Sequence, residues 1–181
     1  NLLNRFYEID SGEISIDGIN IKDYKLSNLR KNIGIVLQDV FLFSDTIFNN
    51  ITLKDESISL NEVKLAAKQI GVHDFIMSLP NNYYYNVKER GIMLSSGQRQ
   101  LIAFLRVYVS DPQILILDEA TSSIDSTSEV LIQNATEKLT NNRTSLIIAH
   151  RLATIKKANN IIVMDSGNII EQGSHKELIS N

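Results

Sequence analysis

Two adjacent carboxylates, Asp118 and Glu119, follow the apolar run Ile114–Leu117. An apolar strand that ends in two carboxylates suits a reaction that needs both a metal ion and an activated water. The first carboxylate can hold Mg²⁺, directly or through water, and the second can orient or deprotonate the water. Strands that end in solvated acids are also common, so the pair alone does not separate a catalytic role from a structural one.

A second element with possible chemistry is the run Ser95-Ser96-Gly97-Gln98. Ser95 and Gln98 have the spacing of a capping box, which predicts the beginning of a helix. A helix N-terminus presents unpaired N–H groups and the positive end of the helix dipole, and Gly97 would let the backbone approach a phosphate closely. An ordinary capped helix without a ligand has the same pattern.

The elements that would position these residues alternate between strands and helices. Strands are predicted at 13–18, 32–38, 113–117 and 144–149, and the last two have the continuous apolar pattern of parallel strands buried on both faces. Capping-box patterns predict helices beginning near Ser59, Ser95 and Ser126. A hairpin over 160–171 and a helix over 175–180 complete the chain. This alternation indicates an α/β domain.

Composition narrows the function classes. The chain has 181 residues, 43% of them hydrophobic, and 18 basic against 21 acidic side chains give a net charge of −3. That balance argues against a nucleic-acid surface, which is normally basic. The absence of cysteine excludes disulfides and thiolate metal sites.

The ordered set of motifs resembles the ATPase domain of ABC transporters. It comprises Gln38 at the end of a strand, Leu94–Gln98, Ile114–Glu119, Ser122–Asp125 and His150 after an apolar run. The resemblance covers essentially the whole chain. It implies a P-loop NTPase (RecA-like) parallel sheet with an inserted helical subdomain. The implied ATPase core is 1–38 and 111–181, and the implied helical signature subdomain is 39–110.

The resemblance also implies a role for each motif residue. Asp118 would hold Mg²⁺, Glu119 would act on the attacking water, and Gln38 would contact Mg²⁺ or that water. His150 would hold the γ-phosphate of ATP and the catalytic Glu119. The other histidines, His73 and His175, lack such a context and are expected at the surface.

In the family the signature run faces nucleotide bound by a second ATPase domain. Ser95, Ser96, Gly97 and Gln98 would therefore contact ATP across a head-to-tail dimer, and Asp125 would contact the opposite domain. The family usually has glycine where this chain has Ser96, which puts the strength of that site in question.

The loop before the signature, Asn86–Gly91, resembles that of exporters, although Asn86 and Lys88 stand where exporters often carry Glu and Gly. The implied partner is therefore the transmembrane domain of an exporter, fused upstream, with the present segment at the cytoplasmic face of the cell membrane. Phe41 and Phe43 match the family segment near that membrane domain.

Two other functions stay open at this stage. One is a non-transport ATPase of the same superfamily, in DNA repair or translation, which would usually carry coiled-coil insertions or duplicated domains. The other is a nucleotide-binding subunit with little turnover, for which Ser96 is mild support and the presence of Glu119 and His150 is evidence against.

The chain contains no G-x-x-x-x-G-K-[ST] run. Its opening residues, 1–7, resemble the helix that directly follows that loop in the family. We therefore expect the phosphate-binding loop to lie upstream, and we expect this chain alone to bind ATP weakly. Calorimetric titration of the chain with Mg·ATP checks this expectation, and a micromolar dissociation constant would contradict it.

Overall fold

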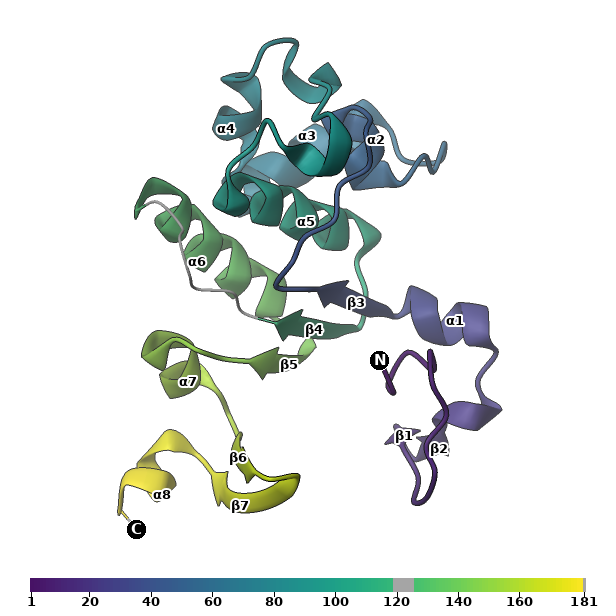
Figure 1. Cartoon of the computed structure of the whole chain (residues 1–181), viewed down its shortest axis with the longest axis vertical. Coiled ribbons are helices and arrows are strands. Elements are labelled where there is room, and N and C mark those ends of the chain that lie inside the picture. The colour runs from purple at the N-terminus through teal and green to yellow at the C-terminus, as the bar shows by residue number, and fades with distance from the viewer. Residues whose placement is uncertain (119–125, 181) are drawn as a thin grey trace.

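The computed structural model describes residues 1–118 and 126–180. Three parallel strands, β3 (Ile33–Val36), β4 (Ile114–Asp118) and β5 (Thr144–Ile148), form the central sheet in the order β3-β4-β5. Two long helices, α5 (Ser96–Ser110) and α6 (Ser126–Thr140), pack together above the sheet (Figure 1). The predicted α/β class with a parallel sheet is confirmed.

The two faces of the sheet are packed differently. Val36, Leu117 and Ile147 are neighbours on adjacent strands, and their row faces α5 and α6 in the main hydrophobic core. The opposite row packs only partly, so that Leu146 is 48% exposed and Ile148 is 52% exposed. The prediction of burial on both faces is therefore wrong for β5, whereas in β4 the second face is partly buried, because Ile114 and Ile116 pack against a smaller cluster around Ile21, Leu29 and Ile33. Alternate residues of β5 are the more buried ones because, within the described ranges, this strand is covered mainly on the face toward α5 and α6.

Helices fill the chain between β3 and β4. Their bounds are α2 (Ile47–Thr52), α3 (Leu60–Ile70), α4 (His73–Met77) and α5, with short 3₁₀ helices at Asn82–Tyr84 and Glu89–Gly91. They form the upper part of the molecule in Figure 1. One continuous core runs from these helices to the sheet. The division into 1–38 with 111–181 and 39–110 therefore stays a prediction.

The starts of α3 and α5 are each defined by a capping box. Ser59 accepts a hydrogen bond from the N–H of Glu62, whose carboxylate accepts one from the Ser59 N–H at 2.7 Å. α3 ends at Gly71, whose φ of 83° is easily adopted only by glycine. α5 has the same reciprocal pair in Ser95 and Gln98 and ends at Asp111, just before Pro112. The boxes predicted at Ser59 and Ser95 are confirmed, and α6 begins at Ser126 as expected.

A hydrogen bond anchors the loop after α4. The hydroxyl of Tyr83 lies 2.8 Å from Nδ1 of His73, and Tyr83 is buried. Burial, with a smaller contribution from the charge of Asp74, raises the pKa of Tyr83 to about 12. His73 and His175 were expected at the surface, but both residues are less exposed than that, because they are half-buried.

The N-terminal part of the chain forms small elements. β1 (Ser15–Ile16) and β2 (Ile19–Asn20) make a hairpin whose turn residues Asp17 and Gly18 both have positive φ, and a 3₁₀ helix at Ile21–Asp23 and α1 (Leu26–Lys31) follow. The predicted strand at 13–18 is thus shorter than expected. An Asp-Gly pair is a strong hairpin signal that the strand prediction did not use.

Residues 1–7 do not form the expected helix but a single turn. The N–H of Phe6 bonds to the carbonyl of Asn1 and that of Arg5 bonds to Leu2, while Arg5 has φ of 50°. This is the bonding pattern of a helix C-terminal cap, in which a left-handed residue stops further helical hydrogen bonds. The guanidinium of Arg30 binds the carbonyls of Asn4 and Arg5 and fixes the turn against α1.

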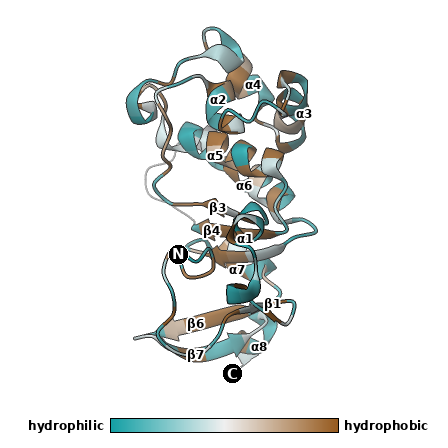
Figure 2. Ribbon diagram, turned by 90° about the vertical axis from the view of Figure 1, so that its right-hand side faces the viewer, coloured by the Kyte–Doolittle hydropathy of each residue, from teal (hydrophilic) through white to brown (hydrophobic). Residues whose placement is uncertain are grey.

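The C-terminal part follows β5 through α7 (Leu152–Lys157). β6 (Ile161–Asp165) and β7 (Asn168–Gly173) form the predicted hairpin, and α8 (His175–Ser180) is the predicted last helix. Figure 2 shows this hairpin and α8 below the central sheet, with a largely hydrophobic β6. Within the described residues, no helix is both long and apolar enough to cross a membrane.

Gly34 offers a test of how closely α5 approaches the sheet. A Cβ at Gly34 would lie 2.6 Å from Cγ of Pro112 and 2.7 Å from Cγ1 of Val107. We expect Gly34→Ala to overpack this contact and to lower the free energy of unfolding by about 1–3 kcal/mol. Urea denaturation followed by circular dichroism measures it. Gln133→Ala, at an exposed position of α6, is the control and should stay within about 0.5 kcal/mol of the wild type.

Candidate functional site at the carboxyl edge of the sheet

Three predicted site residues lie at one edge of the central sheet because parallel strands end on the same side. Asp118 ends β4 and pairs with Ile148 of β5, two residues before His150. Val36, the last residue of β3, pairs with Leu117, so Gln38 follows at nearly the same level. Adjacent strands are about 4.8 Å apart. Asp118 therefore stands between Gln38 on one side and His150 on the other.

Exposure differs among these three residues. Asp118 is half-buried, whereas Gln38 and His150 are exposed. Exposed polar groups beside a half-buried carboxylate form a surface that a charged ligand can reach. The ion pair between Arg151 and Glu129, at 3.2 Å, ties the segment carrying His150 to α6.

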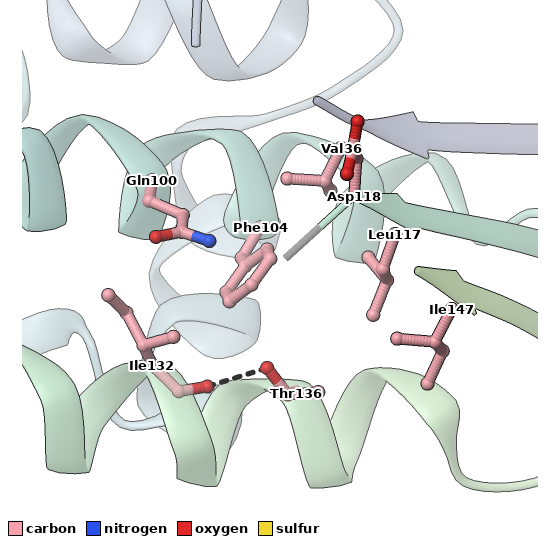
Figure 3. Close-up of a pocket in the computed structure, with 8 residues that line it drawn as sticks. All are labelled: Val36, Gln100, Phe104, Leu117, Asp118, Ile132, Thr136 and Ile147. Carbon is pink, nitrogen blue, oxygen red and sulfur yellow. Dashed lines mark hydrogen bonds between the residues drawn. The ribbon is translucent and has the colours of Figure 1, made fainter. Parts of the chain in front are cut away.

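A small cavity lies directly behind Asp118 (Figure 3). Its walls come from the three strands, α5 and α6. The lining is mostly apolar, with Asp118, Gln100 and Thr136 as its polar members. Thr136 donates its hydroxyl hydrogen to the carbonyl of Ile132, one turn earlier in α6.

Gln100 is the residue of this region to which sequence reasoning gave no role. It lies in α5 one turn after Ser96, is only 4% exposed, and lines the cavity together with Asp118. A buried amide is costly unless its polar atoms find partners, so such a residue commonly has a positional role. A signal existed in the sequence: Gln100 interrupts the otherwise apolar stripe of the helix.

The predicted anion-binding element is the N-terminus of α5. The hydroxyl of Ser95 accepts a hydrogen bond from the N–H of Gln98 at 3.2 Å, and the side-chain oxygen of Gln98 accepts one from the N–H of Ser95 at 3.0 Å. Ser95 and Ser96 are exposed and Gly97 is buried. The box orients the first turn of a 15-residue helix, whose dipole makes this end attractive to an anion.

Two predicted site residues cannot be placed. Glu119 and Asp125 lie in 119–125, outside the described residues. The structure therefore brings Gln38, Asp118 and His150 to one edge and places Ser95–Gln98 at a helix start, and it leaves the roles of all predicted site residues as predictions.

The donor set at the edge suits a magnesium–nucleotide ligand. No group of three or more His, Cys, Asp or Glu side chains among residues 1–118 and 126–180 is arranged to hold a metal ion. Mg²⁺ needs no such group, because it usually binds one or two carboxylates together with water and phosphate oxygens. The carboxylate of Asp118 and the side-chain oxygen of Gln38 are hard oxygen donors of this kind.

Comparison with solved structures identifies the class of protein. The chain superimposes on a structure described as a bacterial Atm1-family ABC exporter with ATP bound, with a TM-score of 0.88 and 43% sequence identity. The match covers 98% of this chain and 31% of the other. The fold is therefore the P-loop NTPase fold found in the ATP-binding domains of ABC exporters.

Sequence comparison identifies the family. Residues 1–122 match the family described as ABC transporter. A protein of Staphylococcus aureus strain COL, named as a multidrug export ATP-binding/permease protein, is 51% identical over 180 residues, and the protein of the same name from a bovine strain is 50% identical. The chain belongs to the ABC transporter family. It spans 31% of the length of these curated relatives, with 99% of its own length matched.

The capping boxes of α3 and α5 provide a matched pair of variants. We expect Ser95→Ala to destabilise the protein by about 0.5–2 kcal/mol and also to lower ATP turnover, because it removes the acceptor that orients the first turn of α5. Ser59→Ala removes the equivalent bond of α3, at 3.3 Å, and should cost similar stability with turnover unchanged. Thermal melting and phosphate release, measured on the full-length protein, separate the two effects. Equal turnover losses would contradict a specific role for the α5 N-terminus.

Proposed function

We propose that this chain is the ATP-hydrolysing domain of an ABC exporter, which powers transport of a substrate across a membrane. The observation that carries the proposal is the placement of Gln38, Asp118 and His150 at one edge of the parallel sheet. Family membership and the ATP-binding/permease relatives support it.

The roles follow from charge and position. Asp118 would hold Mg²⁺ through water, and Gln38, beside it, would contact Mg²⁺ or the attacking water. Glu119 would take or orient the proton of that water, and His150, on the other side of Asp118, would bind the γ-phosphate. Phosphoryl transfer depends mainly on such positioning and on stabilisation of charge. Bound Mg²⁺ would supply the charge that neutralises the phosphate oxygens.

Nucleotide would be shared between two domains. The α5 N-terminus lies at an exposed position, where Ser95, Ser96, Gly97 and Gln98 could contact ATP held by a second copy or a related domain in a head-to-tail dimer. Asp125 would contribute to the same interface. Because the chain has no phosphate-loop motif, we propose that it turns over little ATP by itself and acts within the whole protein.

The transmembrane partner would dock on the aromatic pair Phe41 and Phe43. The two rings are 54% and 53% exposed and contact each other edge to face, with centroids 5.1 Å apart. Exposed apolar side chains that gather in this way mark an interaction surface. The permease part of the named relatives is the occupant that this surface fits, which would place the chain at the cytoplasmic side of a membrane.

The alternatives are less well supported. A non-transport ATPase of the superfamily does not fit relatives named as ATP-binding/permease proteins. A nucleotide-binding subunit with little turnover is favoured only by Ser96. At that position a serine can serve in the first turn of α5, which is well formed here.

Substitution of the proposed base tests the catalytic assignment. We expect Glu119→Gln in the full-length protein to retain ATP binding and to lower turnover by about 10²–10⁴-fold, because an amide cannot accept the proton of the attacking water. Phosphate release and fluorescent-nucleotide binding measure the two effects. Glu56→Gln, at an exposed site before α3, is the control. Turnover near the wild-type rate in Glu119→Gln would overturn the assignment.

A further inference from the structure

The segment that carries the exposed aromatic pair is unusually well anchored. Between Phe41 and Phe43, Leu42 is fully buried in the main core. Its Cδ1 lies 2.9 Å from where a Cβ on Gly91 would be, and the side chain of Arg99 lies 3.1 Å from the same point. Leu42 therefore packs where the loop before the signature run meets the first turn of α5.

Asn50 fixes the same segment through its side chain. It is fully buried in α2, and its amide oxygen accepts a hydrogen bond from the N–H of Phe43 at 2.8 Å. Its amide nitrogen donates to the carbonyls of Phe43 and Thr46, both at 3.0 Å. One side chain thus satisfies both backbone groups of Phe43. A buried amide with three partners holds a unique geometry, because loss of any partner leaves a desolvated polar group.

Arg106 extends this network to α5. Its Nε donates to the carbonyl of Asn50 at 2.8 Å, and a terminal nitrogen donates to the carbonyl of Phe41 at 3.4 Å. Asn50 lies in the last turn of α2, where carbonyls lack helical partners and a cation is favoured by the helix dipole. Burial lowers the pKa of Arg106 from its ordinary value, but an arginine keeps its charge at neutral pH.

We propose that Asn50 and Arg106 are positioning residues that couple the Phe41–Phe43 segment to α5, the helix that begins at the signature run. This inference rests on the proposed function, in which the aromatic pair meets a transmembrane domain. A displacement of the pair is passed through Asn50 and Arg106 to the body of α5 and through Leu42 to its first turn. The N-terminus of α5 then moves with the docking surface.

A double-mutant cycle on ATP turnover of the full-length protein in lipid nanodiscs tests the coupling. Phe43→Ala should lower turnover by about fivefold or more in the wild-type background, the range of typical coupling between sites. In the Arg106→Met background, Phe43→Ala should have a clearly smaller effect, because the contact that transmits the displacement to the body of α5 is lost while the packing of Leu42 remains. Independent residues would instead give additive effects.

Arg143→Met is the matched control. Arg143 is also a partly buried arginine that binds a carbonyl at a helix C-terminus, that of Leu139 at 2.8 Å in α6. The groups that its guanidinium contacts lie outside the Phe41–Phe43 segment, so Phe43→Ala should keep its full effect in this background. A general loss of stability would act alike in both arginine backgrounds.

Arg106→Lys keeps the proposal testable if Arg106→Met fails to fold. A lysine retains the charge and can donate to the carbonyl of Asn50, so it should preserve part of the effect of Phe43→Ala. Additive effects in both Arg106 backgrounds would overturn the coupling. Absence of ATP turnover in the wild-type protein would instead overturn the proposed function, and the two failures are thus distinct.

Discussion

The burial of α5 is the packing on which the rest of the structure depends. Its buried residues cover nearly its whole circumference: Gln100, Leu101, Ile102, Ala103, Phe104, Leu105 and Val107. A helix that is buried over so much of its surface needs neighbours on several sides, and α5 contacts α2, α3, α6 and β3. Each fully buried large apolar side chain contributes about 1.5–3 kcal/mol. The sheet and the preceding helices therefore share one core.

Helix starts could be predicted well from the sequence, because they depend on patterns of a few neighbouring residues. Ser59 with Glu62 and Ser95 with Gln98 lie three residues apart, and the capping box that each pair forms is a local geometry. The carboxyl edge with Gln38, Asp118 and His150 was predictable for a related reason. Once the strands are parallel and neighbouring, their carboxyl ends must meet, although the order β3-β4-β5 is itself a long-range pairing.

Contacts between distant residues explain what sequence reasoning missed. Arg106 and Asn50 are 56 positions apart, and no local sequence pattern around either residue predicts their hydrogen bond. The half-burial of His73 depends on Tyr83 across the turn after α4. The exposed face of β5 was predicted wrongly, because a continuous apolar run shows only that a strand could be buried on both faces. Only the arrangement of covering elements decides whether both faces are in fact buried.

Three features that the proposed function uses lie along α5, so they are held at fixed positions relative to one another. The signature run opens it, Gln100 lines the cavity behind Asp118 one turn later, and Arg106 binds the aromatic segment. Ten residues separate Ser96 from Arg106, about 15 Å of helix. A closely packed helix moves as a body, since bending it would break main-chain hydrogen bonds.

A second connection is the chain itself, because Gln38 precedes Phe41 by three residues. The aromatic pair is thus joined to the carboxyl edge by a short loop and, through Arg106 and the body of α5, to the N-terminus of that helix. In the proposed function, one displacement at the docking surface would therefore act on both halves of the shared nucleotide site.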